Sequence, residues 1–275
     1  MPTARSSAAK PSVANPSAAR PGIPRPSAAG KALAVLACFD RGRPALTLTD
    51  LAHRSGLPLS TTHRVVGELA TWGALERTAE GSWQVGLRLW EVASACPRTQ
   101  ILREVSLPFM QDLYEATHEN IQLGVREGTE LVFVERIAGH RSIDLKTMVG
   151  TRFPLTATGI GMTLLAFAPS EIREAVLAEP VPRHTSQTVT DPRELRAMLA
   201  QIRRSQVAVN DRQLSENTVG VAAPIRVGLR GEVQAALGIV VAGTTAGAVR
   251  HLRAAVLAAS RAVSVELGAR ARTGG

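Results

Sequence analysis

The sequence predicts an α+β protein in two parts, and three observations lead to that prediction. Two short amphipathic helical segments on either side of Gly56 lie near the N-terminus. A strand–turn–strand segment follows them directly. Beyond Pro97, runs with strand and helix spacing are mixed without regular βαβ alternation. We therefore expect a mostly helical N-terminal domain with a β wing. A C-terminal domain on an antiparallel sheet, and not a Rossmann fold, should follow it.

The first 28 residues are rich in Pro, Ser and Ala, and we expect them to form a disordered tail. They carry four basic residues and no acidic one, so the tail can attract phosphate without reading sequence. The alternatives are a solvated linker or a start codon placed too early. A first helix is expected over residues 30–40.

Residues 46–77 have the layout of a helix-turn-helix. A helix over 49–54 is followed by Gly56 at the turn, and Leu57 and Leu59 are expected to fill the angle between the helices. Ser60 is the expected N-cap of the second helix, because its hydroxyl can accept a free amide of the first turn. That helix should run to about residue 71 and end at Gly73.

The second helix presents a polar face near its N-terminus. Helical spacing turns Val65, Val66 and Leu69 inward and leaves residues 60–62 and Arg64 outward. Such a helix offers donors to base edges and phosphates. Residues 75–85 are expected to form the two strands of a wing. The alternative is an αα-hairpin that only contributes to a core, which has no need of this polar face.

A connecting helix is expected over 87–96 and should end at Pro97, where we place the domain junction. Asp191 is a good N-cap ahead of Pro192 at the first helical position. The elements expected in the second domain are helices over 101–117, 171–178, 192–204 and 245–269, a loop over 153–161 that opens a helix through 168, and strands over 120–126, 130–137, 142–148, 219–227 and 231–241.

Composition excludes several classes of protein. The chain of 275 residues has a net charge of +9, but little of it lies in the helix-turn-helix region, so charge alone is weak support for DNA binding. We find no apolar run of about 18 residues and no secretory signal, and expect a cytoplasmic protein without membrane contact. Cys38 and Cys96 are expected in apolar cores.

No cofactor, metal site or catalytic group is expected. The six histidines are scattered without ligand-like spacing, and the chain has no P-loop or GxGxxG motif. Glu135 and Asp144 lie on neighbouring predicted strands and could be paired carboxylates. They are more simply explained as solvent-facing, or as partners of Arg136 and Arg141.

Both halves together resemble the IclR family of bacterial transcription regulators. The segments that carry the resemblance are LTDLAHRSGLPLSTTHRVVGELATWGALER, GSWQVGLRL, VGTRFPLTATGIGMTLLA, VGVAAPI and VQAALGIVV, in that order. The resemblance implies a winged helix-turn-helix over 29–86 after the tail of 1–28. A linker helix over 87–97 and a GAF-like effector-binding and oligomerisation domain over 98–271 should follow. It also implies a homodimer, or a dimer of dimers, on a pseudo-palindromic operator.

By the same resemblance, a set of side chains is expected to face DNA, with the wing residues at phosphate or in the minor groove. This set is Thr49, Ser60, Thr61, Thr62, His63, Arg64, Arg77 and Ser82.

The resemblance also implies a small-molecule pocket between residues 153–162, 210–220 and 238–240. Amides at Gly159 and Ile160 could bind a carboxylate at the start of a helix, although Gly159 and Gly161 could equally serve turn geometry alone. The residues expected to contact the effector are Leu145, Phe153, Thr158, Gly159, Ile160, Asn210, Gly220, Gly238 and Val240.

This chain departs from the members that bind two- or three-carbon keto acids. Those members resemble one another in a Cys before the AAP-like segment and in Ser residues on the last strand. Here the positions hold Gly220, Gly238 and Val240, and Asn210 replaces the usual acid. A tiny, highly charged acid would be left underpaired. We therefore hypothesise a larger, partly apolar effector such as an aromatic acid.

The expected function is a ligand-responsive transcription regulator. Repression of a neighbouring catabolic or metabolic operon, and of its own gene, is the default. A protein-interaction adaptor that has lost DNA binding is an alternative, and a small-molecule enzyme is another.

Overall fold

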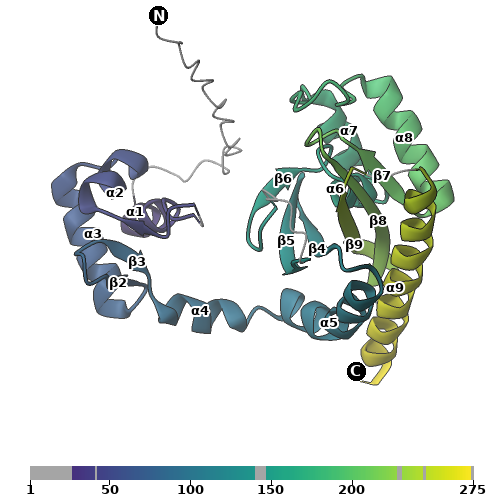
Figure 1. Ribbon diagram of the computed structural model, residues 1–275. Coiled ribbons are helices and arrows are strands. Elements are labelled where there is room, and N and C mark those ends of the chain that lie inside the picture. Colours follow the sequence, from purple (N-terminus) through teal and green to yellow (C-terminus); the bar gives the residue numbers. More distant parts are fainter. Residues whose placement is uncertain (1–26, 41, 140–146, 228–230, 244–245, 274–275) are drawn as a thin grey trace, which may run out of the picture. The chain divides into compact units, whose positions relative to one another are not determined.

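The computed structural model describes residues 27–40, 42–139, 147–227, 231–243 and 246–273 (Figure 1). The chain divides into two compact units, residues 1–94 and 95–275. Each unit has a hydrophobic core of its own. The predicted α+β class is confirmed. None of the described helices is both long and apolar enough to span a bilayer.

The first unit is a helical domain with a small antiparallel sheet in the strand order β1-β3-β2. Its core is formed by Val35, Leu51, Val65, Val66 and Leu75 with their neighbours. The elements are α1 (Ala28–Leu36), β1 (Ala45–Leu46), α2 (Leu48–Ser55), α3 (Leu59–Trp72), β2 (Leu75–Arg77), β3 (Trp83–Val85) and α4 (Leu87–Ser94).

Local sequence explains where the two central helices begin and end. Thr47 caps α2 in a reciprocal capping box: its Oγ1 accepts the Asp50 N–H at 3.1 Å, and the Asp50 carboxylate accepts the Thr47 N–H at 3.1 Å. Gly56 and Gly73 adopt φ values of +67° and +86° after α2 and α3. This left-handed backbone favours glycine and ends each helix.

Several N-terminal expectations need correction. The first helix spans Ala28–Leu36 and not 30–40, since Ser27 caps it by accepting the Gly30 N–H at 3.0 Å. Ser60 is not the N-cap of the second helix, because the N-cap lies two residues earlier, at Pro58, and α3 begins at Leu59. Leu59 is 53% exposed and does not fill the angle between helices, whereas Leu57 packs against the core.

The second unit is built on a six-stranded antiparallel sheet in the order β6-β5-β4-β9-β8-β7. Its helices are α5 (Pro97–Thr117), α6 (Gly159–Ala166), α7 (Ser170–Ala178), α8 (Pro192–Ser205) and α9 (Ala246–Thr273). Its strands are β4 (Asn120–Glu127), β5 (Glu130–Ile137), β6 (Arg152–Pro154), β7 (Ala208–Asp211), β8 (Thr218–Val227) and β9 (Glu232–Ala242).

Helices cover both faces of this sheet. On one face α5 and α9 pack against β4, β8 and β9, and on the other α6 lies against the sheet with α8 behind it (Figure 1). The alternation of β8 explains this, because Val221 and Ala223 point to the α5/α9 side and Ala222 to the α6 side. All eight residues of α6 are buried.

The sheet domain differs from expectation at short and edge elements. Phe153 lies in strand β6 and not in a loop, and β7 was not predicted at all. Pro97 occupies the first position of α5, where its missing N–H does no harm, so it starts a helix. The strand expected over 142–148 falls largely on residues 140–146, outside the described residues. The Asp191 N-cap before Pro192 is confirmed.

The two cysteines lie in different surroundings. Cys38 is buried, as expected, just after α1. Cys96 is exposed, at the N-cap of α5 between the two linker-region helices, so its expected place in a core is wrong. Helix α4, which precedes it, ends at Ser94 and has no buried residue of its own.

Candidate DNA-binding surface and ligand pocket

Helix α3 carries five of the eight residues expected to meet DNA. Ser60, His63 and Arg64 are exposed in its first two turns, and Thr61 is half-buried. Arg64 forms an i,i+4 ion pair with Glu68 on the helix surface, where both side chains are more than half exposed. Such a pair is weakly held, so the guanidinium can exchange Glu68 for an acceptor on DNA.

Thr62 is the exception in this set. Its side chain is completely buried, and its hydroxyl donates to the carbonyl oxygen of Pro58 at 3.1 Å. Residue 62 precedes Val65 and Val66 by three and four positions, which places all three on one face of the helix. The expectation that Thr62 faces DNA is therefore wrong.

The other expected DNA contacts lie on α2 and in the wing. Thr49 is exposed in the first turn of α2. Arg77 is exposed in β2, and its Nε donates to the Gly81 carbonyl at 3.2 Å. Its Cζ lies 5.8 Å from the centroid of the Trp83 ring. Ser82 is half-buried in the turn between the two wing strands. These contacts hold the Arg77 side chain against the wing, with its charge in solvent.

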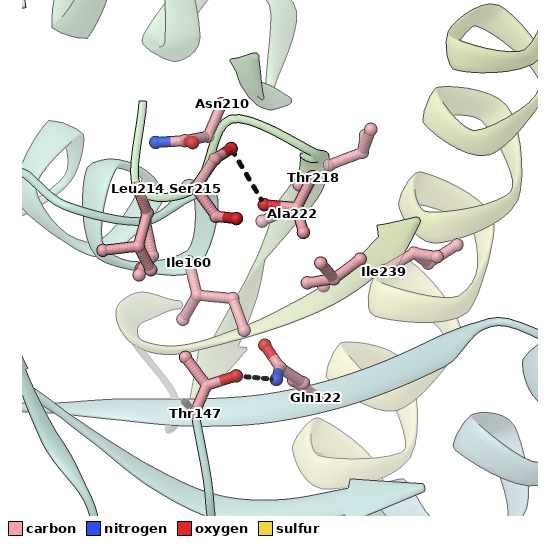
Figure 2. A pocket seen from close by; sticks show the side chains of 15 residues that line it. Gln122, Thr147, Ile160, Asn210, Leu214, Ser215, Thr218, Ala222 and Ile239 are labelled. Carbon is pink, nitrogen blue, oxygen red and sulfur yellow. Dashed lines mark hydrogen bonds between the residues drawn. The ribbon is translucent and has the colours of Figure 1, made fainter. Parts of the chain in front are cut away.

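The second unit contains a cavity of about 70 Å³ between α6, β8, β9 and the loop after β7 (Figure 2). One buried water needs roughly 10–15 Å³ on this scale, so the cavity has room for a small organic molecule. Its lining residues are all uncharged: Gln122, Thr147, Thr158, Gly159, Ile160, Asn210, Leu214, Ser215, Thr218, Gly220, Val221, Ala222, Gly238, Ile239 and Val240.

The N-terminus of α6 opens into this cavity. Thr158 caps the helix by accepting the Gly161 N–H at 2.9 Å. Gly159 and Ile160 come first in the helix, so their N–H groups lie outside its ladder of hydrogen bonds. Both residues line the cavity. Amides at a buried helix N-terminus, together with the helix dipole, favour an anionic ligand group.

Polar side chains lie on two sides of the cavity. Figure 2 shows Gln122 and Thr147 on one side of Ile160, with Asn210 and Ser215 on the other. The Nε2 of Gln122 donates to the Oγ1 of Thr147, and the Nδ2 of Asn210 donates to the Ala157 carbonyl at 3.2 Å. The amide side chains of Gln122 and Asn210 thus lie at separate points of a mostly apolar wall, where each can hydrogen-bond a ligand.

Two glycines give the cavity its width. A Cβ at Gly238 would lie 2.8 Å from Cγ1 of Ile160, closer than real side chains come. A Cβ at Gly220 would meet nothing nearer than Asn210 Cβ at 3.8 Å. Gly238 therefore lets Ile160 pack against β9, whereas a methyl group at Gly220 would make only ordinary van der Waals contacts.

The structure brings together most of the expected effector contacts. Thr158, Gly159, Ile160, Asn210, Gly220, Gly238 and Val240 all line the cavity. Phe153 does not: it is buried in the core beside α6, edge-to-face with Phe133 at 6.0 Å. Leu145 lies outside the described residues.

Sequence reasoning missed several lining residues and one chemical property. Gln122 and Thr147 lie outside the three expected segments. Leu214, Ser215 and Thr218 lie within the expected segment 210–220 but were not singled out as contacts. Thr147, Ser215 and Thr218 carry hydroxyls. The cavity is therefore richer in hydroxyl groups than the glycines and Val240 suggested. A signal existed for Gln122, since a lone amide inside the apolar strand Ile121–Val125 is a buried polar group that needs a partner.

A helix-turn-helix with a wing on one unit and a buried ligand-sized cavity in the other define a helix-turn-helix transcription regulator with an effector domain. Residues 28–79 match the IclR helix-turn-helix domain, and residues 95–265 match the domain described as bacterial transcriptional regulator IclR C-terminal. The chain belongs to the IclR family of bacterial transcription regulators.

Relatives of known class agree with this assignment. The chain is 32% identical to the transcriptional regulator KipR of Bacillus subtilis over 78% of its own length and 84% of that protein. It is 36% identical to the regulator BhcR of Paracoccus denitrificans, over 73% of the chain and 71% of that protein. These relatives are transcription regulators, and the chain belongs to the same class of protein and not to an enzyme family.

A solved structure shows the same fold. An IclR homolog from Microbacterium hydrocarbonoxydans, complexed with 4-hydroxybenzoate, superimposes with a TM-score of 0.83 at 36% identity. The match covers 88% of this chain and 99% of that one. A putative regulator from Rhodococcus sp. RHA1 superimposes with a TM-score of 0.77 at 27% identity.

Proposed function

We propose that the protein is a ligand-responsive repressor, acting on its own gene and on a neighbouring catabolic operon, and that its effector is an aromatic carboxylate close to 4-hydroxybenzoate. The observation that carries the proposal is the cavity at the N-terminus of α6, which joins an amide cradle for an anion to apolar walls. The Microbacterium relative, whose structure contains 4-hydroxybenzoate, supports the same ligand class.

The chemistry of the cavity fits such a ligand. A carboxylate at the amides of Gly159 and Ile160 would gain roughly 0.3–1 kcal/mol from the helix dipole, and up to about 2 kcal/mol when partly buried. The ring would lie against Ile160 and Leu214, and a second polar group would find Gln122 or Asn210. A two-carbon acid would leave the apolar wall and one polar end unused.

A homodimer is the proposed assembly, and exposed apolar side chains of the first unit support it. Leu33 on α1 and Leu87, Trp90 and Val92 on α4 are 56%, 67%, 60% and 58% exposed, and α4 buries no residue of its own. A second copy on these helices would remove that surface from water. Two recognition helices related by a two-fold axis would then read half-sites about 34–36 Å apart on a pseudo-palindromic operator.

DNA binding is tested by fluorescence anisotropy with the upstream DNA of the protein's own gene, over a salt series, against a scrambled duplex. We expect sequence-selective binding that Arg64→Ala weakens by about 5- to 150-fold, the range that roughly 1–3 kcal/mol of base discrimination gives. Arg196→Ala is the matched control, since it removes another arginine from an exposed ion pair, in the other unit. Equal affinity for both duplexes that falls steeply with salt would favour the alternative, a protein-interaction adaptor that has lost specific DNA binding.

The effector class is tested by thermal shift with a panel of acids. We expect 4-hydroxybenzoate and benzoate to raise the melting temperature more than glyoxylate or pyruvate. Stabilisation by the small acids alone would overturn the aromatic assignment. A reporter fused to the upstream DNA tests the sign: repression predicts that loss of the protein, or added 4-hydroxybenzoate, raises expression.

A further inference from the structure

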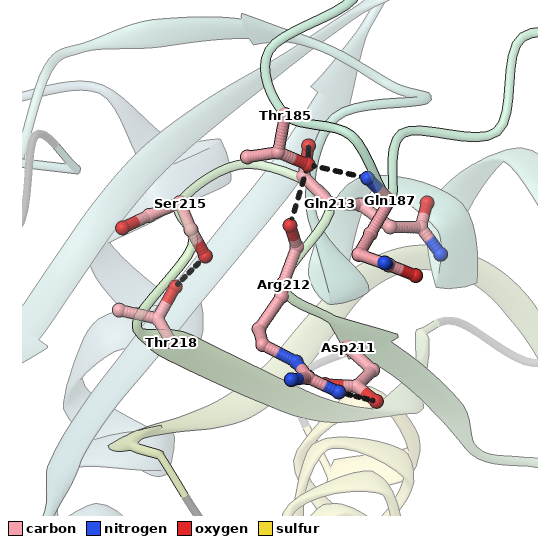
Figure 3. Close-up of polar contacts among 7 residues, drawn as sticks. All are labelled: Thr185, Gln187, Asp211, Arg212, Gln213, Ser215 and Thr218. Carbon is pink, nitrogen blue, oxygen red and sulfur yellow. Dashed lines mark hydrogen bonds and ion pairs between the residues drawn. The ribbon is translucent and has the colours of Figure 1, made fainter.

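Two buried threonines, Thr185 and Thr188, lie between α7 and α8 and contact a distant part of the chain. Figure 3 shows Thr185 beside Arg212 and Gln213. Thr185 and Thr188 are only 7% and 5% exposed, although they lie in a loop. The hydroxyl of Thr185 donates to the carbonyl oxygen of Arg212 at 2.7 Å, and that of Thr188 donates to the carbonyl oxygen of Gln213 at 2.7 Å. The turn thus holds two successive carbonyls of the loop after β7.

Both hydroxyls are also fixed from their own side. The Gln187 N–H donates to Thr185 Oγ1 at 3.1 Å. The N–H groups of His184 and Thr185 donate to Thr188 Oγ1 at 3.0 and 2.9 Å. A hydroxyl has one proton and two lone pairs, so each threonine gives its proton to the loop while its own turn supplies donors to its oxygen. Residues 184–188 form what we call the threonine clamp.

The clamped carbonyls come directly before the cavity wall. Leu214 and Ser215 follow them and line the cavity, as does Thr218 at the end of the loop. The loop is closed at its base, where the Arg212 N–H donates to the Thr218 carbonyl at 3.0 Å and the Thr218 N–H to that of Ser215 at 3.2 Å. The position of this wall therefore depends on how Arg212 and Gln213 are held.

The backbone at Arg212 needs outside support. Its φ of +55° is in the left-handed region, which is unfavourable for a residue with a Cβ. Such conformations persist where the surrounding structure determines them, and they cluster at ligand sites. The clamp supplies a hydrogen bond to the carbonyl of this residue and another to the next.

We propose that Thr185 and Thr188 are positioning residues of the effector pocket, which set ligand selectivity by holding the wall formed by Leu214 and Ser215. The inference rests on the proposed effector function, and neither threonine lines the cavity. Selectivity between aromatic acids of different shape thus depends on two hydroxyls outside the pocket.

The test uses the full-length Thr185→Val/Thr188→Val variant, which keeps side-chain shape and removes both donors. Thr190→Val is the matched control, because its hydroxyl accepts from the exposed Arg183 guanidinium at 3.2 Å and, among the described residues, makes no hydrogen bond to Arg212 or Gln213. The Thr185→Ser/Thr188→Ser variant restores the donors. Calorimetric titration with 4-hydroxybenzoate and 3-hydroxybenzoate gives two affinities and their ratio for each protein.

We expect the double valine variant to lose about tenfold in affinity for the better ligand, the change that about 1.4 kcal/mol produces. The ratio of the two affinities should move towards one, whereas the control and the serine variant keep the wild-type ratio. Equal loss for both ligands at an unchanged ratio would show general destabilisation and overturn the proposal.

Hydrogen exchange of the ligand-free proteins gives a second readout. The amides of Arg212 and Thr218 should exchange faster in the double valine variant than in Thr190→Val. If the Arg212 and Thr218 amides exchanged at the same rate in both variants, the proposed role of the threonine clamp would be overturned, whatever the ligand titrations show. If the wild type binds neither hydroxybenzoate, the proposed effector is wrong, and the exchange comparison still decides the role of the threonines.

Discussion

Thr61 and Thr62 are neighbours that helix α3 turns in different directions. Thr61 is half-exposed on the polar face, and Thr62 is buried with its hydroxyl on the Pro58 carbonyl. Thr61→Val should therefore weaken operator binding, whereas Thr62→Val should leave the affinity within about twofold and act only on stability, by a hydrogen bond's net 0.5–1.5 kcal/mol or less. Anisotropy titrations and urea unfolding separate the two effects. Loss of DNA affinity in Thr62→Val with unchanged stability would contradict this assignment.

The two cavity glycines respond differently to an added methyl group. Gly238→Ala must displace Ile160 and should lower stability by about 1–3 kcal/mol, as overpacking does. Gly220→Ala places its methyl group at an ordinary contact distance, 3.8 Å from Asn210 Cβ, so stability should stay near wild type while 4-hydroxybenzoate binds more weakly. Thermal unfolding with and without the ligand measures both. Equal destabilisation by the two variants would refute this difference in packing.

The capping box of α2 makes the first unit sensitive to acid. Hydrogen bonds from the side chain and then the backbone of Thr47 hold the pKa of Asp50 below its ordinary 3.8. Because the folded pKa is lowered, its stabilisation is complete above the unfolded pKa and is lost as pH falls through the folded value. The stability gap between wild type and Asp50→Asn should therefore be larger at pH 6 than at pH 3.

Tryptophan fluorescence during urea unfolding measures that gap, because Trp72, Trp83 and Trp90 are the only tryptophans and all lie in residues 1–94. Glu216→Gln, an exposed carboxylate of the other unit, is the control and should leave the fluorescence transition unchanged. A gap that stays constant with pH would argue against the capping box as its source.

At the scale of elements, α6 depends on its first turn. All eight of its residues are buried, so its free amides cannot turn to water. Thr158→Ala removes the N-cap and should lower stability by about 0.5–2 kcal/mol, whereas Thr158→Ser keeps the acceptor and most of the stability. Unfolding curves followed by far-UV circular dichroism compare them. Equal losses in both variants would point to packing of the threonine methyl.

Elements with strong local signals were predictable from sequence. Asp191 ahead of Pro192 marks a helix start through its own chemistry, and β5 was predicted over the residues that form it. The four residues of β7 and the three of β6 have no such signal, because they pair at the sheet edges through tertiary contacts. Ser60 failed as a cap because Pro58 can begin a helix without one.

The candidate site was predictable only where motif segments form it. Gly159, Gly220 and Gly238 come from the recognisable segments and line the cavity. Thr147, Ser215 and Thr218 reach it from loops or loop ends, whose course depends on the whole domain. Their hydroxyls can replace the donors that a Cys and Ser residues supply in members that bind small keto acids. The residue types at Gly220, Gly238 and Val240 alone could not predict these hydroxyls.

At the scale of the molecule, two compact units predict two unfolding steps. 4-Hydroxybenzoate should chiefly stabilise the unit of residues 95–275, by about 2.7 kcal/mol at a hundredfold excess over Kd. Operator DNA should stabilise the unit of residues 1–94. Calorimetry resolves the steps, and tryptophan fluorescence reports the first unit alone. A single transition that both ligands shift equally would contradict independent units.

The strand order also governs how a nascent chain acquires its structure. Strand β4 is the first strand of the large sheet to leave the ribosome, yet its neighbour β9 is the last, with Asn120 opposite Val240. The β4–β9 pairing at the middle of the sheet therefore cannot form until β9 has been synthesised, and closing so long a loop slows folding. The first unit needs only local pairings and can fold during translation. Until β9 is made, the apolar residues of β4 and β5 remain exposed, so chaperones are most needed in this interval.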